Sequence, residues 1–109
     1  MSLRVVLHPA AERDLKGIRR KDRQGFRRIV KAIDQYAGTE RGDVKVILPA
    51  KRPGEMPLLR LRAGDWRIYF KVVGEVMWIG AIEKRSKAYQ PWIVEAAGRK
   101  LKELGVEID

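Results

Sequence analysis

The side chains best suited to chemistry in this 109-residue chain are arginines concentrated in residues 58–89. Arg60, Arg62 and Arg67 lie in the first part of this segment, and few acidic residues accompany them. The segment closes on a basic stretch with one tyrosine, made of Lys84, Arg85, Lys87 and Tyr89. Arginine carries a permanent charge and donates in pairs to phosphate oxygens, so the cluster predicts a site for polyphosphate, such as an RNA backbone.

RNA is cut without a metal when its own 2′-oxygen attacks the adjacent phosphorus, which leaves a 2′,3′-cyclic phosphate and a 5′-hydroxyl. Fixed cations favour this step because they neutralise the charge that develops on the phosphate oxygens. The step also needs a base for the 2′-hydroxyl and an acid for the leaving oxygen. No carboxylate or histidine falls on the predicted arginine face, so Lys84, Lys87 or Tyr89 would serve. Tyr89 or Trp66 would alternatively stack on an RNA base.

Two tight turns predict the strands that carry these residues. Gly64-Asp65 and Gly74-Glu75 have the Gly-X form preferred in two-residue type II′ hairpin turns. The flanking runs are rich in β-branched and aromatic residues, which predicts three antiparallel strands. A two-residue first turn then fixes three cross-strand pairs: Ala63 with Trp66, Arg62 with Arg67, and Arg60 with Tyr69.

The second turn, at the same length, places Arg67 opposite Ile82 and Tyr69 opposite Gly80. Side chains alternate between the faces of a strand, so the two turns decide which residues share a face. The predicted charged face holds Arg60, Arg62, Arg67, Tyr69, Lys71 and Lys84. The predicted core face holds Leu59, Leu61, Ile68, Phe70, Val72, Met77, Ile79 and Ala81, with Glu83 at its rim. Like charges opposite each other cost about 0.2–1 kcal/mol, so the charged face is either a solvated surface or a polyanion site.

The bulk composition limits the class of protein. With 24 Lys and Arg against 14 Asp and Glu, the net charge is +10 and the pI is about 10.3. This charge predicts a polyanionic or acidic protein partner. The chain has no cysteine and a single histidine, His8, which excludes disulfides and argues against a zinc site; no cofactor is expected. No apolar run is long enough to span a membrane, so a cytoplasmic protein is expected.

The N-terminal half predicts one strand and two helices. Alternating apolar residues indicate a strand at 3–7, and Pro9 opens an amphipathic helix over residues 9–20. Asp22 caps a second helix, which is predicted to end at Gly38. Both helices carry basic outer faces, for which an ordinary solvated surface is the simpler interpretation and an RNA-facing role the alternative.

The remaining segments complete a single domain over residues 1–109. A strand is predicted at 44–48, followed by a proline-containing loop at 49–57 whose Lys51 and Arg52 would form a lip for substrate. A last amphipathic helix follows Pro91. The predicted order is β-α-α-β-β-β-β-α, an α+β fold with an antiparallel sheet of four to five strands.

Residues 59–89 resemble the RelE/ParE superfamily of toxins from type II toxin–antitoxin systems. The resemblance rests on five features in chain order. They are an arginine-rich strand, the run Gly64-Asp65-Trp66-Arg67-Ile68-Tyr69-Phe70, a glycine turn, an apolar strand, and the run Lys84-Arg85-Ser86-Lys87-Ala88-Tyr89. The rest of the chain agrees with the family in layout and length. RelE-like toxins are ribosome-dependent endoribonucleases that cut mRNA in the decoding site, whereas ParE-like toxins share the fold and inhibit DNA gyrase.

The resemblance implies roles for particular residues. Arg67 matches the family's sheet arginine, and Arg60 matches a lysine position on the preceding strand. Arg85 or Lys84 matches the functional arginine of the terminal basic segment, and Tyr89 the terminal tyrosine. Leu58 occupies a second lysine position, a departure from the family. The basic residues that would compensate for it or bind RNA are Lys51, Arg52, Arg62 and Lys87.

Three functions follow from these observations. The first is a RelE-like toxin that cuts mRNA in the ribosomal A site and is held inactive by an acidic antitoxin. The second is a ParE-like inhibitor of DNA gyrase without nuclease activity. The third is a basic RNA-binding module without catalysis.

Overall fold

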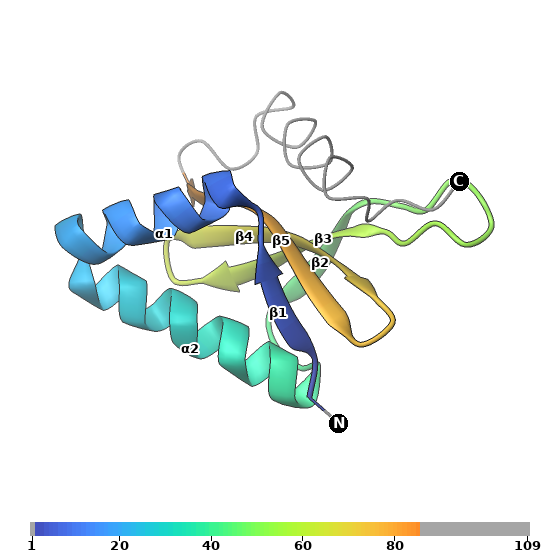
Figure 1. Cartoon of the computed structure of the whole chain (residues 1–109), viewed down its shortest axis with the longest axis horizontal. Helices are drawn as coiled ribbons and strands as arrows, with labels where there is room; N and C mark the ends of the chain where they lie inside the picture. The colour runs from blue at the N-terminus through green and yellow to red at the C-terminus, as the bar shows by residue number, and fades with distance from the viewer. Residues whose placement is uncertain (1, 86–109) are drawn as a thin grey trace.

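The computed structural model describes residues 2–85, which form two helices and a five-stranded sheet (Figure 1). The elements are β1 (Arg4–Leu7), α1 (Pro9–Lys21), α2 (Arg23–Thr39), β2 (Val44–Leu48), β3 (Leu58–Ala63), β4 (Trp66–Val73) and β5 (Val76–Lys84). Across the sheet the strands follow the order β1-β5-β4-β3-β2, with β1 parallel to β5 and the other neighbours antiparallel. The predicted α+β order is confirmed through β5, while the predicted helix after Pro91 lies outside the described residues.

Both helices pack on one face of the sheet and build the hydrophobic core with it (Figure 1). The buried residues of this core are Ala11, Ile18, Ile29, Ile33 and Tyr36 from the helices, and Leu61, Ala63, Ile68, Phe70, Met77, Ile79 and Ile82 from the sheet. Tyr36 meets Phe70 edge to face, with ring centroids 4.9 Å apart and 83° between the ring planes. The helices therefore occupy one face, and the arginine side chains project from the other.

The helix ends show why the two helices begin and stop where they do. Pro9 is the first residue of α1, and the His8 side chain accepts a hydrogen bond from the Ala10 amide at 3.0 Å through Nδ1. The Asp22 carboxylate caps α2 by accepting from the Gly25 amide at 2.9 Å, as predicted. The predicted end of α2 at Gly38 is wrong. The helix runs to Thr39, and Glu40 takes the left-handed cap conformation with φ 55°.

The hairpin between β3 and β4 has the predicted register. Ala63 pairs with Trp66, so the turn consists of Gly64 and Asp65 alone. Gly64 has a positive φ of +61°, whereas Asp65 does not have a positive φ. This combination fits the predicted type II′ turn. Arg62 therefore lies opposite Arg67, and the Arg60–Tyr69 pair two residues further along each strand also forms as predicted.

The pairing of β4 with β5 departs from the prediction halfway along the strands. Near the turn the register is as expected, but the pairing shifts between Tyr69 and Phe70, which leaves Gly80 as the extra residue of a β-bulge. Beyond the bulge Arg67 pairs with Glu83 instead of Ile82, and Tyr69 pairs with Ala81 instead of Gly80. The faces assigned from sequence to the last part of β5 are therefore wrong: Ala81 and Glu83 lie on the arginine face, and Ile82 and Lys84 lie on the helix face.

Candidate nucleic-acid interface

The sheet face away from the helices carries two cross-strand rows of charged residues. The row nearest the β3–β4 turn runs across three strands as Arg62, Arg67 and Glu83. The next row runs across four strands as Lys45, Arg60, Tyr69 and Ala81. Neighbouring strands lie about 4.8 Å apart, so adjacent members of a row are close enough to act on one phosphodiester group. We call this surface the arginine face.

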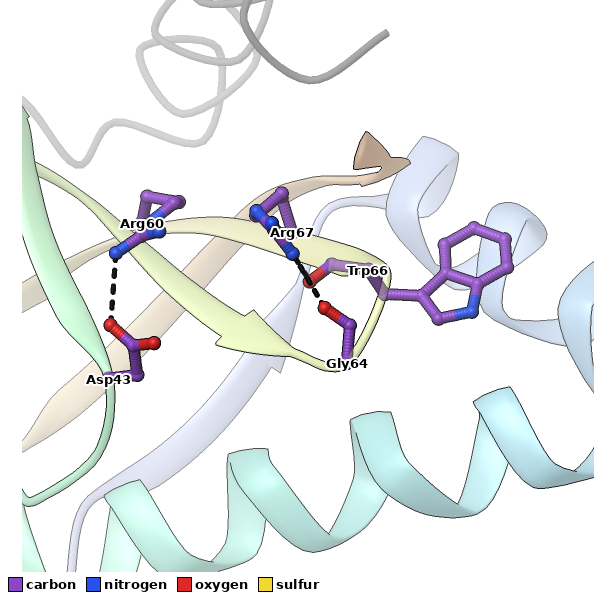
Figure 2. Close-up of polar contacts among 5 residues, drawn as sticks. All are labelled: Asp43, Arg60, Gly64, Trp66 and Arg67. Carbon is purple, nitrogen blue, oxygen red and sulfur yellow. Dashed lines mark hydrogen bonds and ion pairs between the residues drawn. The ribbon is translucent and has the colours of Figure 1, made fainter. Parts of the chain in front are cut away.

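Arg67 is held in place by two backbone carbonyls. Its side chain donates from Nη1 to the Gly64 carbonyl at 2.8 Å and to the Trp66 carbonyl at 3.0 Å (Figure 2). The residue is only 2% exposed. Both acceptors belong to or flank the β3–β4 turn, so the turn itself fixes where the guanidinium lies. A cation fixed before substrate arrives needs no reorganisation to stabilise developing charge.

Arg60 is also buried, at 6% exposure, and is paired with a carboxylate. Its Nη2 lies 3.2 Å from Oδ1 of Asp43, which precedes β2 and has a 58% exposed side chain (Figure 2). The sequence-based expectation that no acid cancels this charge is wrong for Arg60. The pairing depends on β2 lying beside β3, a contact between residues 17 positions apart that no local pattern predicts.

Arg62 is the exposed arginine of this face, although it lies directly opposite Arg67. Its backbone amide donates to the Asp43 carbonyl at 2.9 Å, which ties the strand but leaves the side chain at the surface. Lys45 is a second exposed cation, paired across the sheet with Arg60, and sequence reasoning missed it because its strand was not placed beside β3. The arginine face therefore combines buried, fixed cations with exposed ones.

Arg85 joins this group through the same turn. It is exposed, and its backbone amide donates to the Asp65 carbonyl at 2.7 Å. Gly64 and Asp65 thus hold the Arg67 side chain and the Arg85 backbone respectively. The backbone positions of Arg62, Arg67 and Arg85 therefore lie around one turn, and their part in a reaction stays a prediction.

Lys84, by contrast, lies on the helix face because of the Gly80 bulge. Its Nζ lies 5.7 Å from the centre of the Trp66 ring, a cation–π contact on the side of the sheet that packs against the helices. Trp66 is part of the core periphery, and its indole nitrogen donates to Asp22 in a long bond of 3.4 Å. The prediction that Lys84 shares a face with Arg67 is wrong, and its contacts are those of a structural residue.

Asp22 joins α2 to the sheet through these contacts. The hydrogen bond from the Gly25 amide is the main cause that lowers the pKa of Asp22 from its ordinary value of 3.8, and the bond from Trp66 and the charges of Lys84 and Arg28 act in the same direction. Burial opposes them. Asp22 is thus a charged cap on the helix side of the sheet.

Lys51 and Arg52 lie at the other end of β3. Both are exposed, and their backbone amides donate to Oε2 of Glu55 at 3.0 and 3.1 Å. The bond from the Lys51 amide is the main cause that lowers the pKa of Glu55, and the charge of Lys71 contributes to the same shift. Six residues of β3 span roughly 17 Å, so this loop is separated from the Arg62–Arg67 row.

The remaining candidates divide into three kinds. Tyr89 and Lys87 lie outside the described residues, so their roles stay predictions. Leu58, at the family lysine position, is buried at the start of β3. Glu83 is one of the β5 residues that the sequence analysis assigned to the wrong face. The signal that would have corrected it is Gly80, a glycine inside a strand. Among residues 2–85 no cluster of three or more histidine, cysteine or acidic side chains offers a metal site.

The fold places the chain among small α+β proteins of known structure. A solved chain from the archaeal RelE-RelB complex of Pyrococcus horikoshii OT3 aligns with a TM-score of 0.63 and 24% identity, over 81% of this chain and 100% of that chain. The YoeB dimer from Staphylococcus aureus aligns with a TM-score of 0.55 and 20% identity, over 76% of this chain and 97% of that chain. The RelE-like fold expected from residues 59–89 is therefore confirmed.

These likenesses establish the fold, and other comparisons add no further relative. No protein-family model matches the chain, and a search of curated proteins gives no significant match. Neither α1 nor α2 has the length and apolar character needed to cross a bilayer.

Proposed function

We propose that this chain is the toxin of a type II toxin–antitoxin pair and that it cleaves mRNA on the ribosome. The observation that carries the proposal is the gathering of Arg62, Arg67 and Arg85 around the β3–β4 turn, on a fold shared with RelE and YoeB. The family resemblance of residues 59–89 supplies the reaction: attack of an RNA 2′-oxygen on the adjacent phosphorus.

The buried and exposed arginines take different parts in this reaction. Arg67 is fixed by two carbonyls and provides a preorganised positive charge for the phosphate oxygens. Arg62 and Arg85 are exposed and engage the backbone of the incoming strand through paired donors. Arg60 lies in the next cross-strand row, where its ion pair with Asp43 holds its side chain in position. In the predicted reaction Tyr89 serves as an acid or a base, or stacks on an RNA base.

The direct experiment adds the purified protein to a translating extract and follows a defined message. The proposal predicts cuts within the translated region when ribosomes are present, with 5′-hydroxyl and 2′,3′-cyclic phosphate ends. The same message without ribosomes should stay intact. An uncut message in the translating extract would contradict the proposal.

The proposed partner that restrains the toxin is an acidic antitoxin. The solved chain of the Pyrococcus horikoshii protein belongs to a complex with RelB, and the net charge of +10 attracts an acidic, partly disordered chain that folds on binding. A small acidic protein encoded by the neighbouring reading frame would support this pairing.

A gyrase inhibitor without nuclease activity is the second candidate. The observation that favours it is the burial of Arg60 and Arg67, whose charges are bonded to Asp43 and to backbone carbonyls and therefore also stabilise the fold. Leu58 at a family lysine position points the same way. This candidate predicts DNA double-strand breaks on induction and inhibition of purified gyrase, with no cut in the message.

A further inference from the structure

The β-bulge at Gly80 places a carboxylate in the arginine row. With an unbroken register, Ile82 would lie opposite Arg67 and Glu83 would point to the helix face. The bulge shifts β5 by one residue, and Glu83 becomes the cross-strand partner of Arg67. Bulges commonly redirect a side chain next to an active site. Here the redirected side chain is the one acidic residue on the Arg62–Arg67 row.

The spacing of this row suits the geometry of RNA cleavage. Cross-strand partners have Cβ atoms about 5 Å apart, so the carboxylate of Glu83 and the guanidinium of Arg67 can contact neighbouring atoms of one nucleotide. The 2′-hydroxyl and the phosphorus that it attacks are such neighbours. Arg67 is held by the Gly64 and Trp66 carbonyls, so its charge stays on the phosphate side of the pair.

Glu83 can also be reached from outside the fold. It is half-buried, whereas Arg67 is almost fully buried. The cleft of about 520 Å³ that it also borders, between α1 and the end of β5, opens on the helix side beside Trp66 and Lys84 and is not the approach to the arginine face. The charged groups nearest to it are Arg67 on the adjacent strand β4, Arg62 on β3 beyond that strand, and Lys84 and Arg85, which follow it in the chain. Arg13, Asp14, Lys21 and Asp22 lie around the cleft.

We propose that Glu83 is the general base of the RNA cleavage, an assignment that rests on the proposed function. The carboxylate takes the proton of the 2′-hydroxyl while the 2′-oxygen forms its bond to phosphorus. The bond from phosphorus to the 5′-oxygen breaks, and the leaving oxygen takes a proton from solvent water. Arg67 and Arg62 stabilise the charge on the phosphate oxygens during this exchange. Glu83 later returns its proton to solvent.

Glu83 replaces Lys84 in this role for two reasons. Lys84 lies on the opposite face and contacts the Trp66 ring, so it does not share a surface with Arg67. A carboxylate is ionised at neutral pH and accepts a proton without prior deprotonation, whereas a lysine side chain is an acid under the same conditions.

The test compares Glu83→Gln with the unmodified protein by the pH dependence of message cleavage in a ribosome-containing reaction. A general base typically contributes 10²–10⁴-fold, so Glu83→Gln should lower the cleavage rate by about 100-fold or more. It should also remove the rise in rate with pH that reports deprotonation of the base. Glu75→Gln, an exposed residue in the β4–β5 turn, is the matched control and should cleave at the unmodified rate.

Two further variants keep the assignment falsifiable. Glu83→Asp keeps the charge and should retain the pH-dependent rise at a lower rate, and it serves as the working variant if Glu83→Gln does not fold. A Glu83→Gln protein that folds and keeps both rate and pH profile would overturn the assignment while leaving the proposed function intact. A loss of rate that is equal at every pH would assign Glu83 a structural role instead. An uncut message with the unmodified protein would overturn both.

Discussion

Two arginines that pair across one hairpin differ in their burial and in their hydrogen bonds. Arg62 and Arg67 are cross-strand partners, yet Arg62 is exposed and Arg67 is 2% exposed with two carbonyl acceptors. Sequence alternation identifies both as residues of one face but does not distinguish them. The difference arises because the Arg67 side chain folds back onto the turn that precedes its own strand.

Arg67→Ala should therefore destabilise the fold, in contrast to Arg62→Ala. Loss of the buried guanidinium leaves the Gly64 and Trp66 carbonyls without their donor, and we expect a loss of about 3 kcal/mol in the free energy of unfolding. Arg62→Ala should change it by less than about 0.5 kcal/mol. Urea unfolding of the two variants checks this. Equal stabilities would show that the Arg67 contacts are energetically neutral.

The lowered pKa of Asp22 predicts how the stability of the fold depends on pH. Its folded pKa lies below its ordinary value, mainly because of the Gly25 amide, so the ionised cap stabilises the fold at pH values above the unfolded pKa. This contribution is lost as the pH falls through the folded pKa. Asp22→Asn keeps a capping side chain but cannot titrate. Its melting temperature should fall less steeply than that of the unmodified protein between about pH 5 and pH 2. Parallel curves would contradict the assignment.

At the scale of elements, α2 approaches the sheet closely at Gly25. A Cβ added there would overlap the Asp22 carboxylate and the Trp66 indole nitrogen, whereas a Cβ at Gly17 in α1 would meet no atom within 4 Å. Gly25→Ala should destabilise the protein by about 1–3 kcal/mol through overpacking, despite the higher helix propensity of alanine. Gly17→Ala is the matched control and should stabilise it by roughly 0.5–1 kcal/mol. Thermal unfolding measures both, and a stabilising Gly25→Ala would contradict this packing.

The two hairpins show what local sequence can and cannot determine. Gly64-Asp65 is a turn signal that acts only on its neighbours, and the β3–β4 register followed from it correctly. Gly74-Glu75 is an equally good signal, and the pairing next to it was also correct. The error began at Gly80, where β5, which lies between β1 and β4, carries a bulge that the turn does not encode. A turn sets a register only until the next irregularity.

At the scale of the whole molecule, the layout explains why the site was only partly predictable. The identities of Arg60, Arg62 and Arg67 and their common face followed from alternation. Asp43 and Lys45 did not, because they reach this face only when β2 pairs with β3. The charge balance of the arginine face is therefore a property of the assembled sheet.

The basic surface predicts steep salt dependence for RNA binding. Binding of a 2′-O-methylated single-stranded RNA, which cannot be cut, should weaken linearly in log Kd with log salt, by about 0.7 per phosphate neutralised. Arg62→Ala should reduce this slope by about one phosphate contact. Fluorescence anisotropy at several salt concentrations measures it. An affinity that does not change with salt would show that the arginine face does not contact the backbone.

Cleavage by a single exposed-arginine variant tests the central claim most directly. Arg62→Ala alters the arginine face and Arg27→Ala alters an exposed arginine on α2, so the two remove the same charge from opposite layers of the molecule. In a translating extract, Arg62→Ala should cut a message at least about tenfold more slowly, while Arg27→Ala should cut at the unmodified rate. Equal cleavage by both folded variants would contradict a role for the arginine face in the reaction.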